Sequence, residues 1–148
     1  CVAGDLIALG ANPQKTIDDT FYSKTHMQNQ ILGQALLNSH MELDGQCIVT
    51  CLRKEVFDHY HASSVDVDGV VDQIRITRGI EVAVFYYEYE PDVYKFSLRS
   101  NEKVDVSKIA LTHEGGGHIR AAGFSLAGEQ SQVEAEVLEQ IRQALNEA

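Results

Sequence analysis

The strongest hydrophobic pattern lies in the middle of the chain. Residues 80–89 are apolar at both alternating sets of positions, which is typical of a strand that is covered on both faces. A Glu-Pro-Asp turn follows, and residues 93–100 then alternate between apolar and polar. The two faces of this second strand are Tyr94, Phe96 and Leu98 on one side and Lys95, Ser97 and Arg99 on the other. The polar face is either solvated or a row of donors beside a binding site.

Shorter patterns predict the elements on either side. An Asp-Gly turn within 41–52 predicts a hairpin, and residues 123–127 form a last strand. Helical spacing and capping residues predict helices over 2–9, 13–22, 24–39, 53–60, 67–76, 106–112 and 130–147, with Asn12, Ser23 and Asp105 as N-caps. We therefore predict an α/β fold: a mixed sheet of about five strands with helices on both faces.

The segment with the most chemistry is Gly115-Gly116-Gly117-His118, with Arg120 just beyond it. Each glycine costs roughly 0.5–1 kcal/mol relative to alanine inside a helix or strand, so the run predicts a loop. Such a loop exposes backbone N–H groups and lets a ligand approach the main chain closely. His118 and Arg120 add ionisable donors, which suits an anion such as a phosphate. A flexible surface loop with a solvated histidine is the alternative.

Composition narrows the function that such a loop can serve. The chain has 148 residues, which suits one domain with part of another, and its formal net charge is −10. A protein that coats long nucleic acids needs a basic surface, so this class is excluded, whereas one local site for a small anion is not. The sequence has no long apolar run and no signal-peptide pattern, and it opens at Cys1. We expect a cytoplasmic protein with no membrane partner, of which this chain is a portion.

Two other groups of reactive side chains are interpreted as structural. Cys47 and Cys51 share one face of a predicted strand and lack a second pair for zinc, so we expect buried, reduced thiols. The Asp-His-Tyr-His segment at 58–61, with Asp66 and Asp68 nearby, contains metal-ligand types, but an exposed polar loop explains it. We predict no metal site in this chain.

A set of motifs occurs here in the order found in a known family. They are Asp68-Gly69-Val70-Val71, Gly79-Ile80-Glu81-Val82-Ala83-Val84, Ser97-Leu98-Arg99-Ser100, Val104-Asp105-Val106-Ser107, the glycine run with His118, and Ala121-Ala122-Gly123-Phe124. Over about residues 30–148 the sequence resembles the DHH-associated domain (subfamily 1) of the DHH phosphoesterases. The closest type is the nanoRNase and 3′-phosphoadenosine-5′-phosphate phosphatase, with cyclic-dinucleotide phosphodiesterases as relatives.

The resemblance implies a two-domain enzyme. Its DHH domain holds two manganese ions through Asp and His ligands, and water attacks phosphorus there. Residues 1–22 resemble the tail of that preceding domain and a linker, and 23–148 the associated substrate-binding domain. No Asp-His-His motif occurs in this chain, so we expect it to contain no catalytic residue, and to bind substrate without hydrolysing it.

The resemblance also implies which residues bind the substrate. The family's binding residues map onto Gly115, Gly116, Gly117, His118 and Arg99. An arginine can meet a phosphate bidentately, and a histidine can donate to a phosphate oxygen. Ser97, on the same strand face as Arg99, and Arg120 are secondary candidates. Where family members carry an aromatic-Gly pair before the glycines, this sequence has His113-Glu114.

Three functions remain open at this point. The favoured one is the nucleotide-binding or short-oligonucleotide-binding domain of a manganese-dependent phosphoesterase that hydrolyses nanoRNA, nucleoside 3′,5′-bisphosphates or cyclic dinucleotides. The alternatives are a non-catalytic nucleic-acid-binding module of a larger protein and an assembly domain with a vestigial loop. The sequence does not separate the three substrates, because pocket shape decides among them. It also leaves the oligomeric state open, a homodimer included.

Overall fold

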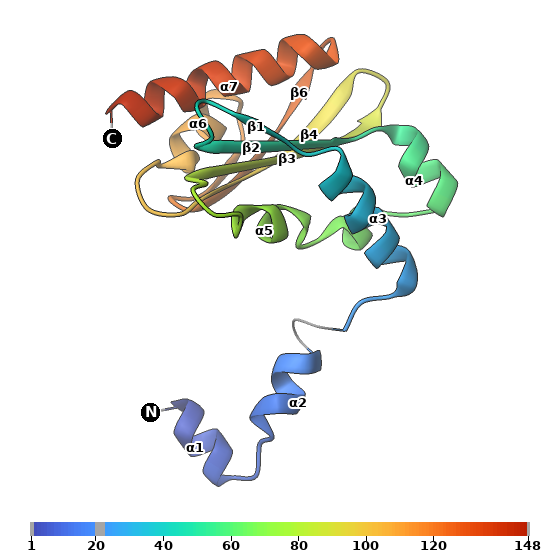
Figure 1. The fold of residues 1–148 in the computed structure, drawn as a ribbon, viewed down its shortest axis with the longest axis vertical. Helices are drawn as coiled ribbons and strands as arrows, with labels where there is room; N and C mark the ends of the chain where they lie inside the picture. The colour runs from blue at the N-terminus through green and yellow to red at the C-terminus, as the bar shows by residue number, and fades with distance from the viewer. Residues whose placement is uncertain (1, 20–22, 148) are drawn as a thin grey trace.

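The computed structural model describes residues 2–19 and 23–147. A six-stranded mixed sheet lies at its centre, with strand order β1-β2-β3-β4-β6-β5 (Figure 1). Its strands are β1 His40–Glu42, β2 Cys47–Leu52, β3 Val82–Glu90, β4 Val93–Ser100, β5 Gly116–His118 and β6 Ala121–Ala127. Strands β2 and β3 are parallel, and the other neighbouring pairs are antiparallel. The predicted mixed sheet is confirmed, with one strand more than about five because the glycine run itself forms β5.

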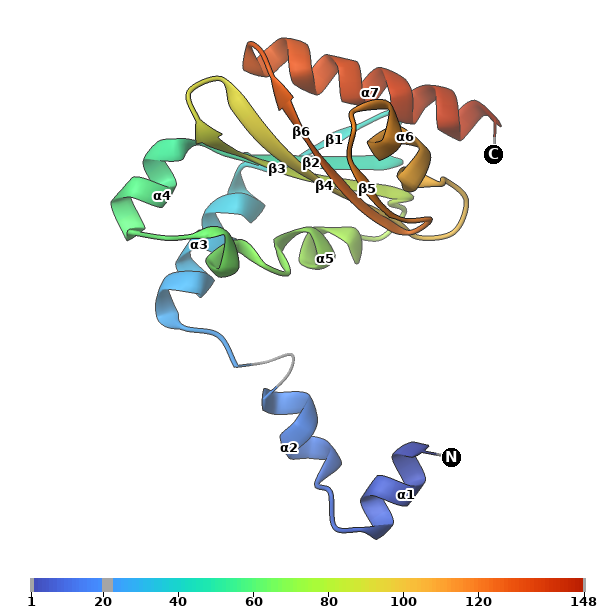
Figure 2. The same ribbon diagram turned by 180° about the vertical axis from the view of Figure 1, so that it is seen from behind.

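Helices cover both faces of the sheet, as the sequence predicts (Figures 1 and 2). The helices are α1 Val2–Ala8, α2 Pro13–Ile17, α3 His26–Leu37, α4 Lys54–Tyr60, the 3₁₀ helix η2 Ser64–Val67, α5 Val70–Arg75, α6 Val106–Thr112 and α7 Gln130–Glu147. Helices α6 and α7 lie on one face, while α3, α4 and α5 lie on the other. No helix in the described ranges combines the length and apolar character that crossing a bilayer requires.

Strand β3 is buried on both faces, as its continuous apolar sequence predicts. Val84 and Tyr86 pack into the core beneath α6 and α7, and Phe85 and Tyr87 pack into the core beneath α3, α4 and α5. Strand β4 is fully covered on one face and only partly covered, by α5, on the other. Its apolar residues Tyr94, Phe96 and Leu98 are fully buried, whereas Lys95, Ser97 and Arg99 are partly or fully exposed.

On the face that carries α3, α4 and α5, the helices cover only part of the sheet. The uncovered part contains the candidate site. Helix α3 packs on β2, α4 on β3, and α5 on β3 and β4. In the part of the chain that the structure describes, no helix makes extensive contact with β5 or β6 on this face. The sheet therefore carries an open half-face formed by the polar side of β4 and the adjoining β6 and β5.

Helix boundaries differ from the prediction at the start of the chain. Helix α3 begins at His26 rather than at 24, because Thr25 and not Ser23 is its N-cap. The Thr25 hydroxyl accepts from Gln28 N (3.1 Å), and the Gln28 side chain accepts from Thr25 N (3.0 Å), so two otherwise unpaired amides are satisfied together. The predicted caps Asn12 and Asp105 are confirmed. Helix α2 ends at Ile17, and the end predicted for it near residue 22 lies outside the described residues.

Candidate functional site

The glycine run is an edge strand rather than a loop. Residues Gly116–His118 form β5, which pairs with Gly123, Ala122 and Ala121 of β6. The expectation of a loop over these residues was wrong, because hydrogen bonding to β6 outweighs the low strand preference of glycine. Only Gly115 stays outside the strand, where its amide donates to Ala110 O at the end of α6 (2.9 Å).

The three glycines are needed for different reasons. A Cβ on Gly115 would lie 2.4 Å from Gly123 O, and one on Gly117, where φ is +145°, would lie 2.4 Å from Ala121 O. Neither position accommodates a side chain. At Gly116 the backbone is not in the left-handed region, and a Cβ would have no other heavy atom within 4 Å. Packing therefore does not explain Gly116, and its bare backbone leaves space for a group from outside the chain.

The sheet register brings the candidate residues onto one face. Directly paired residues of neighbouring strands share a face. The pairing gives three parallel rows across β4, β6 and β5: Lys95 with Ser125, Ser97 with Gly123 and Gly116, and Arg99 with Ala121 and His118. In the middle row only Ser97 has a side chain, because its partners Gly123 and Gly116 are glycines. The surface is therefore low along this row, which we call the floor of the site. Lys95 lies in the row on one side of it and Arg99 in the row on the other. Arg99, Ser97, His118 and Gly116 thus lie together on the open half-face, as the alternation of β4 suggests.

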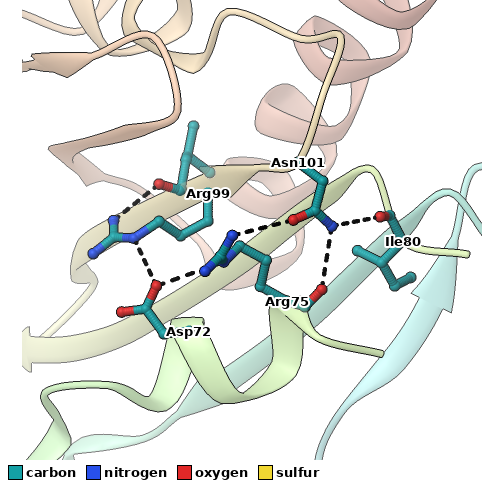
Figure 3. A network of polar contacts seen from close by, with 6 residues as sticks. Asp72, Arg75, Ile80, Arg99 and Asn101 are labelled. Atoms are coloured by element: carbon teal, nitrogen blue, oxygen red, sulfur yellow. Dashed lines mark hydrogen bonds and ion pairs between the residues drawn. The ribbon is translucent and has the colours of Figure 1, made fainter. Parts of the chain in front are cut away.

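Arg99 is held in place by helix α5 (Figure 3). Its Nε donates to Asp72 Oδ1 (3.1 Å) and its Nη1 donates to Leu98 O (3.1 Å), while the side chain remains 28% exposed. Asp72 also lies 3.7 Å from Arg75 Nε, and Arg75 Nη1 donates to Asn101 Oδ1 (3.2 Å). This network fixes the guanidinium and leaves its second terminal nitrogen, Nη2, without a partner among the described residues.

Four polar side chains of the open half-face have no hydrogen-bond or ion-pair partner among the described residues. They are Lys95, Ser97, His118 and Ser125. Lys95, His118 and Ser125 are exposed and Ser97 is half-buried, so a ligand from solvent can reach all four side chains. A row of unpaired donors beside a bare backbone is therefore an arrangement suited to an anionic ligand.

Arg120 is engaged with the protein itself. Its guanidinium donates to Val104 O (2.7 Å) and to Glu102 O. The buried carboxylate of Glu81 accepts from Lys103 N (2.6 Å) and Val104 N (2.9 Å), so the 102–104 segment is held through both its carbonyls and its amides. In this arrangement Arg120 positions the loop behind β5, and a contact with substrate remains only a prediction.

The His113-Glu114 pair retains the physical role of an aromatic residue followed by a turn. The His113 ring stacks on Phe124, with centroids 4.6 Å apart and planes at 23°, and its Nε2 hydrogen-bonds with Gln140 Oε1 (2.8 Å). Glu114 has φ +57°, a left-handed conformation in which glycine is the least strained residue. The chain therefore turns into β5 with a strained glutamate in place of glycine.

Two cavities adjoin the polar face of β4. The smaller, about 170 Å³, lies between β4 and the η2–α5 segment and is bordered by Arg99, Ser97 and Asp68. The larger, about 550 Å³, lies beneath α4. Both are bordered by Lys95. Sequence reasoning placed Lys95 on the polar face but did not single it out, and only the strand alternation signalled its position.

The described residues do not fit a metal centre. Within ranges 2–19 and 23–147 no group of three or more His, Cys, Asp or Glu side chains could hold a metal ion. Cys47 and Cys51 are free thiols on the same strand face, and burial raises the pKa of each to about 12. Cys1 lies outside the described residues.

Comparison with known proteins shows the family of this chain. The sequence model of the DHHA1 domain matches residues 44–148. The chain belongs to the DHHA1 domain family. A curated relative is the bifunctional oligoribonuclease and PAP phosphatase NrnA of Thermus thermophilus, 30% identical over 99% of this chain. The chain spans 44% of that relative, which is less than half of its length.

Solved structures share the fold. An exopolyphosphatase-related protein from Bacteroides fragilis superimposes with a TM-score of 0.87 at 21% identity, covering 98% of this chain and 44% of its own. The pGpG-specific phosphodiesterase PggH from Vibrio cholerae superimposes with a TM-score of 0.57 at 12% identity, covering 79% of this chain and 40% of its own. In both proteins, too, this DHHA1 fold corresponds to less than half of the chain.

Proposed function

We propose that this DHHA1 domain binds the phosphate of a nucleotide or short oligonucleotide on its open half-face, as the substrate-binding part of a DHH phosphoesterase. The observation that carries the proposal is the alignment of Arg99 and His118 in one row of the sheet, beside the bare backbone of Gly116. The relative NrnA, which is an oligoribonuclease and PAP phosphatase, supports the substrate class. The candidate substrates are nanoRNA, nucleoside 3′,5′-bisphosphates and cyclic dinucleotides.

Each residue of the proposed site makes a different contact with the ligand. Arg99 supplies a fixed guanidinium, whose planar donors match phosphate oxygens. His118 supplies a ring nitrogen from β5, and an edge strand also leaves every second backbone amide unpaired on its outer side. Ser97 supplies a hydroxyl at the floor between them. Glycine at 116 lets the ligand reach this floor, because no Cβ stands above it.

Hydrolysis is assigned to a separate DHH domain of the same parent chain. That domain would supply two manganese ions to activate water, whereas the described residues hold no metal-ligand cluster. Helices α1 and α2 lie apart from the sheet (Figure 1). Leu6 and Ile7 of α1, and Leu9 just after it, are exposed apolar residues. We assign residues 1–22 to the end of that domain and the linker, where such side chains would be covered.

Nucleotide titration of the chain tests the proposal. Adenosine 3′,5′-bisphosphate should bind, and Arg99→Ala and His118→Ala should each weaken binding by about tenfold to a hundredfold, since a charge-assisted hydrogen bond contributes roughly 1.5–3 kcal/mol. Arg99→Lys should restore binding only in part, because an ammonium group cannot form the same fork. Arg142→Ala is the matched control, since Arg142 lies on α7 on the opposite face and pairs with Glu139. Equal affinities for wild type, Arg99→Ala and His118→Ala would show that this face is not the binding site.

A further inference from the structure

The larger cavity is not used by the phosphate site proposed above. It is bordered by α4, the start of η2 and the ends of β3, β4 and β6. Ser64, Tyr87 and Lys95 border both this cavity and the smaller one beside Arg99. The two cavities therefore adjoin along one side of β4, and Lys95 stands where they meet.

The charges of the larger cavity leave one cation unpaired. Its two carboxylates already have partners: Asp58 pairs with Lys54 (2.8 Å), and the buried Glu88 pairs with Arg53 (3.2 Å). Lys95 has no hydrogen-bond or ion-pair partner among the described residues. An anion that enters this cavity thus meets a free ammonium group, and it does not have to compete with a carboxylate for it.

The neutral lining of the larger cavity suits a nucleoside. Tyr89 is 43% exposed and presents an aromatic ring, on which a base can stack. Ser64 and Ser125 line the same cavity with hydroxyl groups that have no partner among the described residues. Ser63 is different, because its hydroxyl donates to Asp66 (2.9 Å).

The spacing along β4 suits a ligand longer than one phosphate group. Lys95 and Arg99 lie four residues apart on the same face, so their Cα atoms are roughly 13 Å apart at about 3.3 Å per residue. The smaller cavity, which both residues border, is also lined by Asp68. A carboxylate repels a phosphate and accepts a hydrogen bond from a sugar hydroxyl. The region next to Asp68 is therefore suited to a ribose, with anionic groups at its two ends.

We propose that the larger cavity is a second subsite, which holds the nucleotide adjoining the phosphate bound by Arg99 and His118. Lys95 contacts the phosphate of this second nucleotide, and Tyr89 and Ser125 contact its nucleoside. The inference rests on the proposed phosphate site. A ligand of two linked nucleotides is held at two points on this surface, whereas a mononucleotide is held at one.

Parallel titrations with adenosine 5′-monophosphate and the diadenylate pApA test this second subsite. Lys95→Ala should weaken pApA binding by about tenfold and leave the monophosphate within about twofold, and Lys95→Arg should retain tight pApA binding. Arg99→Ala should weaken both ligands. In ¹⁵N-labelled chain, the amide signals of Tyr89 and Ser125 should shift with pApA and not with the monophosphate. Lys108→Ala is the matched control, because Lys108 lies on α6 on the opposite face.

The outcomes separate the two proposals. If Arg99→Ala weakens both ligands while Lys95→Ala weakens neither, or weakens both equally, the second subsite is wrong and the phosphate site stands. If Arg99→Ala changes the affinity for neither ligand, the phosphate site is wrong, and so is the second subsite that rests on it. Thermal denaturation of each variant shows whether it is folded. If Lys95→Ala does not fold, the amide signals of Tyr89 and Ser125 in the wild-type chain decide, and equal shifts with both ligands would show that the second subsite is wrong.

Discussion

At the scale of single residues, consecutive glycines of identical chemistry serve different purposes. Gly115 and Gly117 are required by the close approach of β6, whereas Gly116 faces open space. Stability and binding should therefore respond separately to substitution within one short segment. The neighbouring Glu114 shows a third case, in which a left-handed backbone is occupied by a residue with a side chain.

Alanine substitutions along the glycine run should separate these roles. Gly116→Ala should leave the free energy of unfolding within about 1 kcal/mol of wild type, because the new Cβ meets no atom and the unfolded chain loses freedom. It should nevertheless weaken nucleotide binding, because the methyl group stands above the floor of the site. Gly117→Ala should destabilise by about 2 kcal/mol or more through the clash with Ala121 O and backbone strain. Urea denaturation and nucleotide titration of both variants provide the measurements, and a strongly destabilised Gly116→Ala would contradict this assignment.

Glu114→Gly should stabilise the protein. A non-glycine residue in the left-handed region costs roughly 1–2 kcal/mol, part of which is offset by the greater freedom of glycine in the unfolded chain. We expect a net gain of about 0.5–1 kcal/mol in urea denaturation. Glu114→Ala keeps the strain and is the control. An equal gain from both variants would assign the effect to the charge of Glu114 and not to its backbone.

At the scale of elements, the helix starts show how local contacts decide boundaries. Helix α3 begins after Thr25, although Ser23 offers a similar hydroxyl two residues earlier. The difference is Gln28, which stands three residues after Thr25 and closes a reciprocal pair of hydrogen bonds with it. Ser23 has Met27 and His26 in the corresponding region, and neither offers such an acceptor.

Removing the cap of α3 should therefore have a position-specific effect. Thr25→Ala should destabilise by about 1 kcal/mol, because Gln28 N loses its acceptor. Ser23→Ala, the matched control, should change stability by only a few tenths of a kcal/mol. Thermal or urea denaturation measures both. A larger effect from Ser23→Ala would show that the helix starts where the hydrophobic pattern alone places it.

The start of α6 should contribute to the pH dependence of stability. Hydrogen bonds from the Ser107 hydroxyl and backbone amide lower the pKa of Asp105 below its ordinary value. Because the folded pKa is the lower one, this stabilisation is present above the unfolded pKa and is lost as pH falls through the folded pKa. Asp105→Asn keeps a capping oxygen that does not titrate, so it should lose less stability than wild type between about pH 5 and pH 3. Parallel pH curves of the two proteins would contradict this origin.

At the scale of the whole molecule, an acidic chain carries a cluster of unpaired donors on one face of its sheet. The formal net charge is −10, yet the unpaired cation and donors of the open half-face lie together on β4 and its neighbours. Association with a short ligand depends on the local field, and association with a long polyanion depends on the whole surface. We therefore expect the proposed site to favour short ligands over long strands.

Ligand length should reveal this preference. Affinity should rise from one nucleotide to two and then change by less than about threefold up to roughly ten nucleotides, because the formal net charge of −10 disfavours contact with a longer polyanion. Titration of an oligoadenylate series at constant salt measures this. A steady rise with length, accompanied by a steep salt dependence, would instead favour a nucleic-acid-binding module of a larger protein.

Local sequence pattern determined much of the architecture. The period-two alternation predicts which residues of β4 are buried, and the double apolar set predicts that β3 is covered on both faces; both are confirmed. The helix over residues 106–112 and its cap at Asp105 also follow from neighbouring residues. The cap depends on contacts between residues close in sequence, and the burial of the strands depends on which of their positions are apolar. Both kinds of information can be read from a single sequence.

Tertiary structure alone decided how the site is assembled. The strand order leaves β5 and β6 without a helix on one face, and the pairing with β6 converts a predicted loop into an edge strand. The bond from Arg99 to Asp72 joins residues 27 positions apart, and Lys95 adjoins two cavities only because α4 and α5 pack beside β4. Candidate residues of suitable chemistry could be identified from the sequence. Their alignment across the strands, their hydrogen-bond partners and the space beside Gly116 depend on packing between distant segments, which no local pattern encodes.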